Sequence, residues 1–500
     1  DKITLHLDGI VFSLCEAFRD DDKDVIVLAK DCSRLVGQYT KLENGLYYLV
    51  PKCLGNVSNQ DDANTRVGVQ DSAGARLGAL SMLSNVLYGT PKLEKKENVD
   101  KIMEVLSDPL LCELGLESYS LLGELLRSLQ ELILRLEKEN EGGIKLMSHE
   151  AKQKTLKTLL FLISLENSSD EQLKDISKAA NTTISKLEED ENQLISTFAK
   201  PILDEILDNK GAVESQKWNK ASIERRVFDQ LVRKCIQLNV SGIDEFYTEM
   251  ISVLEKSCST CADADLRLCQ LSLLQSYIAD QFQFETNVFR FRKQILFDIL
   301  MPNLIWRVGR VASTIRKITM FALGTFLVKL TLMTTGKSNR FDWLLEEIAQ
   351  IMPLLKSSLD DFEADTRMFT CQVLGFIFVL FQSQQDTCLD PTIFQDIYHP
   401  LVCRLDDAQD LVRIAACKAI EDLIRCTDKA ALRGTALKYI VESCFVHLDD
   451  RDKNIQQAVY KVLETIIKAD IDTPVVQAHA KKERTRHRSP ELCDMLLNLK

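Results

Sequence analysis

Residues 331–340, TLMTTGKSNR, come close to a phosphate-binding loop. Such a loop has Gly, four free positions and then Gly-Lys-Ser or Gly-Lys-Thr, so that backbone N–H groups and the lysine hold nucleotide phosphates. Gly336, Lys337 and Ser338 fit this pattern, but Thr331 stands where the first glycine should be. The preceding residues, 315–330, have the pattern of an amphipathic helix, whereas a phosphate loop follows a buried strand. Because glycine commonly ends helices, we interpret the stretch as a linker.

Two other short motifs match metal-binding or redox patterns only in part. Cys258 and Cys261 form CSTC, but no second pair lies at zinc-binding spacing, so a turn between helices is favoured. His149 opens HEAKQ, in which Gln153 replaces the second histidine of a zinc-protease helix. The six histidines form no ligand cluster by spacing. The sequence therefore predicts no catalytic, cofactor-binding or metal-binding residues and no enzyme activity.

The composition indicates a helical protein of a reducing compartment. Its 500 residues include only 19 Gly and 10 Pro, few for a turn-rich β protein. A net charge of −12 argues against a nucleic-acid groove, which needs concentrated positive charge. The 15 cysteines are scattered singly, as free thiols are, and the longest apolar run, 368–381, is too short to cross a bilayer. We expect a cytoplasmic protein with no nucleic acid, membrane or small-molecule substrate as partner. The lack of an initiator Met suggests a fragment of a longer protein.

A repeat organises the C-terminal part of the chain. The segments LDDFEADTRMFTCQVLGFI, LDDAQDLVRIAACKAIEDL and LDDRDKNIQQAVYKVLETI begin at Leu359, Leu405 and Leu448, at intervals of 46 and 43 residues, and a fourth copy begins at Val308. Offsets +7, +10, +14, +15 and +18 from these residues are mostly apolar, and steps of three and four place them on one helical stripe. The positions are Ile315, Ile318, Ala322, Leu323 and Phe326; Thr366, Phe369, Val373, Leu374 and Ile377; Val412, Ala415, Ala419, Ile420 and Leu423; and Ile455, Ala458, Val462, Leu463 and Ile466.

Three further features recur with this stripe. A proline lies in an amphipathic helix upstream, an aspartate lies at the turn, and an arginine lies at offset +8 of the second helix. These residues are Pro302, Pro353 and Pro400; Asp361, Asp407 and Asp450; and Arg316, Arg367 and Arg413. The aspartate can cap the following helix, and together the features are the HEAT pattern, whose helix pairs must stack to bury both faces. We therefore predict an all-α HEAT-repeat superhelix (α-solenoid) of about ten helical hairpins, in which these aspartates and arginines form a structural ladder.

The chain divides by pattern into four parts. Residues 1–136 are HEAT-like repeats with an inserted polar loop near 56–70, and 137–290 are divergent HEAT-like hairpins. We interpret the charged stretch 137–193 as loops or irregular helices inserted into the array. Residues 291–480 are regular HEAT repeats, and 481–500 are a basic connector and a C-terminal helix. The connector, KKERTRHR at Lys481–Arg488, is either a patch for an acidic partner or a solvated link.

Three segments of the C-terminal part carry a more specific resemblance. NLIWRVGRVASTIR (303–316), VHLDDRDKNIQQAV (446–459) and HRSPELCDMLL (487–497) resemble the HEAT-repeat dynein axonemal assembly factor 5 family, over about 296–500. The Trp306-Gly309-Arg310 turn and the His-Arg-Ser-Pro ending are the more specific elements, because no packing rule demands them. The resemblance implies a non-catalytic cytoplasmic scaffold for preassembly of the dynein arms of motile cilia. It also implies binding to dynein intermediate or heavy chains and to other assembly factors or chaperones, through residues that stay unassigned.

Two other functions stay open at this point. One is another HEAT-repeat adaptor, such as a phosphatase scaffold or a transport receptor. A transport receptor would show tryptophans at repeating offsets, but Trp218, Trp306 and Trp343 do not align. The other is a nucleotide-dependent enzyme, which rests on TTGKS alone.

Overall fold

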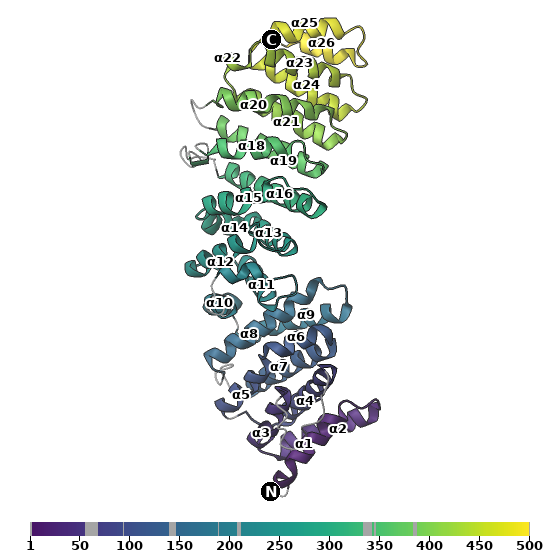
Figure 1. Cartoon of the computed structure of the whole chain (residues 1–500), viewed down its shortest axis with the longest axis vertical. Coiled ribbons are helices and arrows are strands. Elements are labelled where there is room, and N and C mark those ends of the chain that lie inside the picture. Colours follow the sequence, from purple (N-terminus) through teal and green to yellow (C-terminus); the bar gives the residue numbers. More distant parts are fainter. Residues whose placement is uncertain are drawn as a thin grey trace. The chain divides into compact units, whose positions relative to one another are not determined.

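The computed structural model describes residues 3–55, 69–93, 95–139, 147–188, 190–207, 212–333, 343–344, 347–383 and 388–499. Over these ranges the chain is helical and contains no β-strand, as predicted for an α-solenoid (Figure 1). It forms two compact units. Unit 1 comprises Asp1–Glu214 and Trp218–Glu249, and unit 2 comprises Ser215–Lys217 and Met250–Lys500.

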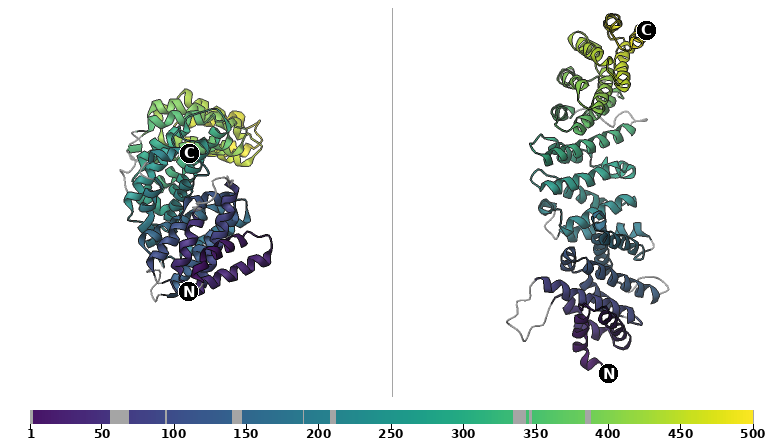
Figure 2. Two further views of the ribbon diagram at one scale, coloured as in Figure 1. Left: turned by 60° about the horizontal axis from the view of Figure 1, so that its bottom comes forward. Right: turned by 90° about the vertical axis from the view of Figure 1, so that its right-hand side faces the viewer.

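The helices of unit 1 lie in two layers (Figure 2), and neighbouring helices within each layer pack against each other. One layer contains α2 (Lys23–Tyr39), α4 (Val69–Gly89), α7 (Tyr119–Glu139) and α9 (Glu171–Ile184). The other layer contains α1 (Leu7–Ala17), α3 (Leu42–Cys53), α5 (Lys96–Leu106), α8 (His149–Ile163) and α10 (Glu191–Leu207). Helix α6 (Pro109–Glu117) packs on α7, and α11 (Ile223–Gln237) packs on α8 and α10.

The charged stretch 137–193 differs from the sequence interpretation. Instead of an irregular insertion, it contributes the regular helices α8 and α9, which pack against each other and against the helices α5 and α7. Helix α8 has nine buried residues between Ala151 and Ile163, because all its charged residues precede the apolar run 159–163 at its C-terminal end. The stretch therefore belongs to the layers of unit 1.

Unit 2 has the same kind of two-layer plan, with the first helix of each hairpin in one layer and the second helix in the other. Its second helices are α13 (Ala264–Ala279), α16 (Arg310–Leu332), α19 (Ala364–Gln382), α21 (Asp410–Cys426) and α24 (Lys453–Lys468). Its first helices are α15 (Met301–Leu304), α18 (Ile348–Ser358), α20 (Pro391–Val402), α23 (Thr435–Leu448) and α25 (Thr473–Glu483). Shorter or flanking elements are α14 (Gln281–Gln283), α22 (Lys429–Leu432) and α26 (Pro490–Asn498). Helix α12 (Asp244–Ser257) has its first residues in unit 1 and the rest in unit 2. Consecutive second helices make the most extensive contacts of the unit.

The predicted core stripe is correct at four of its five offsets. Residues at +7, +14, +15 and +18 of all four repeats are buried. The +10 residues are instead half-buried: Ile318, Phe369, Ala415 and Ala458. An apolar residue at this offset therefore faces out of the core, onto the surface of the second helices.

Before α15 the chain contains two π-helical segments, Phe284–Val288 and Gln294–Leu300, which the sequence pattern does not predict. Pro302 lies two residues after the end of the second one, within α15. Proline has no N–H and its ring crowds the carbonyl four residues earlier, so it favours local widening of a helix.

Two helices of unit 2, α16 and α19, are long and apolar enough to cross a membrane by length and composition. About half of the most apolar stretch of each, 50% and 56%, is buried inside the structure. A core helix packed on both sides has the same composition, and both helices pack against second helices on either side.

Candidate functional site: a ladder and an inner groove in unit 2

The structure brings each predicted arginine to the aspartate of the following repeat. Arg316 Nε donates to Asp361 Oδ2 at 2.6 Å, and both side chains are buried. Arg367 binds Asp407 through two bonds, Nε to Oδ2 at 2.7 Å and Nη2 to Oδ1 at 2.8 Å. Arg413 Nη2 donates to Asp450 Oδ2. We call these three pairs the ladder.

The second oxygen of each aspartate accepts a backbone N–H two residues further on. The donors are Glu363 at 3.0 Å, Gln409 at 3.0 Å and Asp452 at 2.8 Å. These donors are the N-cap residues of α19, α21 and α24, so the aspartates stabilise the turn before each helix rather than capping the helix itself. Each carboxylate thus joins its own turn to the preceding repeat.

Each ladder arginine also binds the turn of its own repeat. Arg316 Nη1 donates to the Arg307 carbonyl at 2.8 Å, and Arg367 Nη1 donates to the Asp361 carbonyl at 2.8 Å. Arg413 Nε donates to the Leu405 carbonyl at 2.9 Å. A planar guanidinium can make these bonds in two directions at once, whereas a lysine ammonium cannot reproduce the geometry. Two successive turns are therefore fixed by one side chain.

Electrostatics at the central rung follow from this geometry. Burial would raise the pKa of Asp407, but the hydrogen bonds from Arg367 and from the Gln409 N–H outweigh it and lower that pKa. For Arg367, the hydrogen bond to Asp407 is the largest cause of a raised pKa. Both partners are thus held in their charged forms.

The C-terminal His-Arg-Ser-Pro segment lies against the last repeat, where the ladder ends. Gln456 stands at the arginine offset of the last repeat, and its Nε2 donates to the Asp450 carbonyl at 2.7 Å. Ser489 Oγ donates to Gln456 Oε1 at 3.3 Å, and the Arg488 N–H donates to Asp449 Oδ1 at 2.6 Å. The His-Arg-Ser-Pro ending, which the repeat pattern does not require, is therefore held to the last repeat by hydrogen bonds.

A similar rung exists in unit 1, where the sequence analysis identified none. Arg76 Nη1 donates to Asp108 Oδ2 at 3.0 Å, and Arg76 Nη2 donates to the Leu54 carbonyl at 2.9 Å. Asp108 Oδ1 accepts the Leu110 N–H at 3.1 Å. The Asp-Pro dipeptide that begins α6 is the sequence signal that could have identified it.

The motifs considered for chemistry lie in ordinary structural surroundings where the structure describes them. Thr334–Ser338 fall outside the described residues, and the segment before them is helix α16. Cys258 is buried, and Cys261 is exposed in the turn before α13. The His149 ring lies 4.5 Å from that of Phe198. Among the described residues, no group of three or more His, Cys, Asp or Glu side chains could hold a metal ion.

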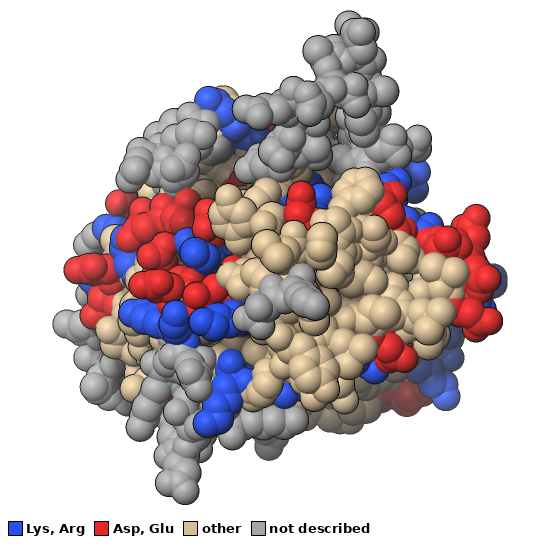
Figure 3. Space-filling view, turned by 90° about the horizontal axis from the view of Figure 1, so that it is seen from below, with Lys and Arg blue, Asp and Glu red and all other residues tan. Residues whose placement is uncertain are grey.

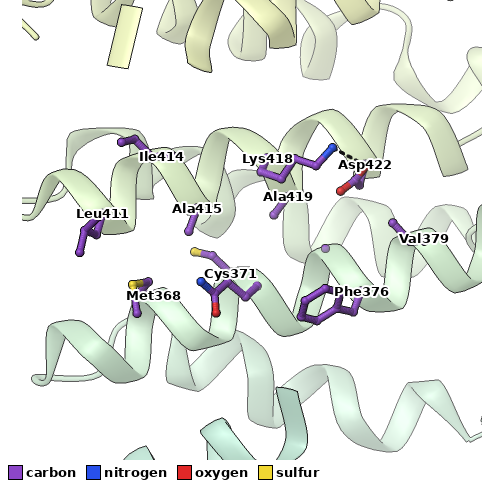
Figure 4. Close-up of a pocket in the computed structure, with 12 residues that line it drawn as sticks. Met368, Cys371, Phe376, Val379, Leu411, Ile414, Ala415, Lys418, Ala419 and Asp422 are labelled. Atoms are coloured by element: carbon purple, nitrogen blue, oxygen red, sulfur yellow. Dashed lines mark hydrogen bonds and ion pairs between the residues drawn. The ribbon is translucent and has the colours of Figure 1, made fainter. Parts of the chain in front are cut away.

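Small side chains open a groove between α19 and α21. Gly375 of α19 faces Ala419 of α21, and Ala415 lies one turn earlier on α21 (Figure 4). The groove has a volume of about 380 Å³. Its walls are mostly apolar and include Met368, Phe376 and Val379 of α19 and Leu411 and Ile414 of α21. We call it the inner groove, since it lies on the layer of second helices.

The apolar character continues onto α16. The Phe321 and Phe369 rings of α16 and α19 lie 5.2 Å apart, and Phe321 is exposed. Phe369 is one of the half-buried +10 residues, as is Ala415 within the groove. The offset that departs from the core pattern therefore supplies apolar surface to the second helices.

One end of the inner groove is polar. Lys418 Nζ lies 3.3 Å from Asp422 Oδ1, and Arg425 Nη1 lies 3.2 Å from the same oxygen. Burial raises the pKa of Asp422, while Lys418 opposes that change. Gln382 Nε2 of α19 donates to the Asp422 carbonyl at 2.9 Å, which ties the two walls together.

Unit 1 also exposes apolar side chains on α1 and α2. Phe12, Val27, Leu28, Leu35 and Tyr39 are all exposed. Figure 3 views the molecule from below the orientation of Figure 1 and shows a broad uncharged area bordered by acidic and basic groups.

No protein-family model matches the chain. Its sequence is similar to dynein axonemal assembly factor 5 of Mus musculus, with 23% identity over 99% of this chain and 53% of the relative. The Xenopus laevis protein of the same name is 22% identical over 100% of this chain and 54% of the relative, and the Homo sapiens protein is 22% identical over 99% and 53%. The resemblance recognised in the sequence is confirmed and extends over nearly the whole chain. The chain spans about half the length of these curated relatives.

Solved structures show a more distant similarity. A crystal structure of importin beta matches 99% of this chain and 63% of its own, with 12% identity and a TM-score of 0.40. Kap121p bound to RanGTP matches 99% of this chain and 52% of its own, with 14% identity and a TM-score of 0.33.

Proposed function

We propose that this protein is a non-catalytic cytoplasmic scaffold that assists preassembly of axonemal dynein arms for motile cilia. The observation that carries the proposal is the similarity, along nearly the entire chain, to three proteins named dynein axonemal assembly factor 5. The proposed partners are dynein intermediate or heavy chains, together with other assembly factors and chaperones. In this role the protein holds subunits in position and performs no chemistry on them.

The inner groove is the surface we propose for a dynein chain. Layered helices present a continuous surface of second helices, which suits extended or partly folded segments. The groove supplies apolar walls, and exposed Leu411 stands at its rim. Burying one leucine side chain of a client there gains roughly 1.5–3 kcal/mol before ordering costs are subtracted.

The ladder gives this surface its rigidity in the proposal. The ladder pairs fix the turns that precede α19, α21 and α24, and the first two of these helices form the groove. The pairs join Asp361, Asp407 and Asp450 to Arg316, Arg367 and Arg413. A groove whose walls do not move relative to each other loses less conformational entropy when it binds. We therefore propose a structural, positioning role for all six residues.

The test is co-purification of dynein chains from the cytosol of ciliated cells with the full chain as bait. Leu411→Asp places a charge at the groove rim, where the leucine is 68% exposed, so folding should be unaffected. Val446→Asp is the matched control, because Val446 is 71% exposed on α23 in the layer of first helices. We expect the wild type and the control to retain dynein intermediate or heavy chains and Leu411→Asp to retain at least about tenfold less, because a carboxylate would lose hydration against an apolar client side chain.

Two results would count against the proposal. If the wild-type chain retains no dynein chain, the assembly role is wrong. If Leu411→Asp retains as much as the Val446→Asp control, the role can stand but the inner groove is not the surface involved.

A further inference from the structure

The turn that precedes α16 is unusually apolar for an exposed segment. All seven residues from 305 to 311 are exposed. They include Ile305, Trp306, Val308 and Val311, with Trp306 59% exposed and Val308 85% exposed. The corresponding turn before α21 presents Asp406, Ala408 and Gln409 instead. We call residues 305–311 the Trp306 turn.

The Trp306 turn also carries positive charge without a partner. Within the described part of the chain, the exposed side chains of Arg307 and Arg310 make no ion pair. Arg310 begins α16, whose first turn contains no acidic residue, so the positive end of this helix is uncompensated as well. Gly309, with φ at 114°, allows the backbone to enter the helix from this turn.

Beneath the turn, the ladder is interrupted. Arg267 of α13 is buried, and its Nε and Nη2 donate to Asn303 Oδ1 at 3.1 and 2.5 Å. Asn303 is neutral, whereas the three ladder rungs have a carboxylate, and Arg310 stands at the offset of the ladder aspartates. Burial lowers the pKa of Arg267, and the nearby charge of Arg307 adds to that effect. The buried charge of Arg267 therefore adds to the positive potential of the exposed residues Arg307 and Arg310.

We propose that the Trp306 turn is a docking site for an acidic segment of another protein that carries a large apolar side chain. The acidic groups of that segment lie against Arg307 and Arg310, where no carboxylate of the described chain is present. Its apolar side chain packs on Trp306 and Val308. Exposed tryptophan and arginine are the residue types most enriched at energetically dominant contact points.

An anionic membrane is the competing partner for an exposed aromatic and basic turn. The net charge of −12 disfavours it, because an acidic protein is repelled by an anionic lipid surface beyond the few residues that contact it. A protein segment needs only local complementarity. This inference does not depend on the proposed role in dynein assembly.

The test uses a fluorescein-labelled peptide in which aspartate and glutamate alternate with leucine and phenylalanine, titrated with the full chain and followed by anisotropy. We expect saturable binding that weakens as salt is raised. Trp306→Ala and the double variant Arg307→Glu/Arg310→Glu should each weaken binding about tenfold or more. Matched controls are Phe362→Ala and Arg451→Glu, which alter exposed residues of other inter-helix turns and should bind as the wild type does.

Thermal melting, peptide binding and vesicle binding of each variant are measured together. Thermal melting should be unchanged in the variants, and Val308→Asp replaces Trp306→Ala if that variant does not melt like the wild type. Absence of saturable binding to the wild type, or equal binding by the variants and the controls, would overturn the proposal. So would Trp306-dependent binding to phosphatidylserine vesicles without binding to the peptide, since the turn would then be a membrane contact.

Discussion

The central rung of the ladder gives the most direct test of its structural role. Arg367 makes a bidentate contact with Asp407, whose side chain is 3% exposed, while the Arg367 side chain is 13% exposed. Arg367→Ala would leave the carboxylate buried without its main partner. Removing one member of a buried pair costs roughly 3–5 kcal/mol. We expect about 3 kcal/mol here, because Arg404 Nη1 stays 3.6 Å from Asp407 and the Gln409 N–H still donates to it.

Hydrogen exchange of backbone amides is the suitable assay, because a layered repeat protein opens locally and a single global unfolding energy is poorly defined for it. A loss of about 3 kcal/mol corresponds to exchange about 150-fold faster in the most protected amides of α19 and α21. The matched control is Lys356→Ala, which breaks the Lys356–Asp396 pair at 3.3 Å between α18 and α20. Its side chains are 46% and 76% exposed, so the expected loss is below about 1 kcal/mol.

The double variant Arg367→Leu/Asp407→Leu separates the cost of an unpaired charge from that of a lost contact. Replacing both members of a buried pair with apolar groups is commonly much less damaging than removing one. We expect the double variant to recover most of the protection that Arg367→Ala loses. Equal effects of Arg367→Ala and Lys356→Ala on exchange would refute the ladder as a structural element.

Two further predictions concern packing and pH. Gly375→Ala should leave the melting temperature unchanged or raise it, since a Cβ there meets its neighbours at no less than 3.7 Å and alanine favours a helix by about 1 kcal/mol. Gly37→Ala should lower the melting temperature, because its Cβ would overlap the Val86 carbonyl of α4. Burial, and then Arg413, lower the pKa of His447, so the folded state favours its neutral form. The free energy of unfolding should therefore fall as the pH drops below roughly 6.5, the pKa of a histidine in the unfolded chain. In thermal melts between about pH 7 and 5.5, His447→Gln should remove this part of the pH dependence. An unchanged pH dependence in the variant would show that the assigned cause is wrong.

The sequence predicts the fold and suggests the ladder positions for one reason: both repeat in register. Every repeat must bury the same stripe, so the apolar offsets and the Asp–Arg positions recur and can be aligned without coordinates. Arg76 and Asp108 of unit 1 make the same kind of contact but were missed, because no aligned copies surround them. Periodicity identifies a position that recurs and gives no information about one that stands alone.

The surface features could not be predicted in this way. The +10 residues are apolar like their neighbours on the stripe, but they lie at its edge on a helix of 3.6 residues per turn, and Phe369 and Ala415 are half-buried. The inner groove arises because Gly375 and Ala419 meet across two helices, which is a coincidence of two sequence positions 44 residues apart. The sequence also suggests that Trp306 is special without showing that it is exposed.

The two ends of the ladder differ in a way that bears on binding. At the C-terminal end, Gln456 is neutral and the chain supplies its own partner through Ser489. At the other end, Asn303 satisfies Arg267 with a neutral amide, and the charges of Arg307 and Arg310 above it are left without a carboxylate. A repeat protein can accept an external acidic group at such a place without breaking any rung of its own, because the internal hydrogen bonds are already made. An interrupted ladder can therefore keep its layers packed and still present unpaired positive charge at the surface. Aspartate is the residue at the Arg310 offset in the three ladder repeats. Arg310→Asp should therefore remove docking at the Trp306 turn and leave the melting temperature unchanged.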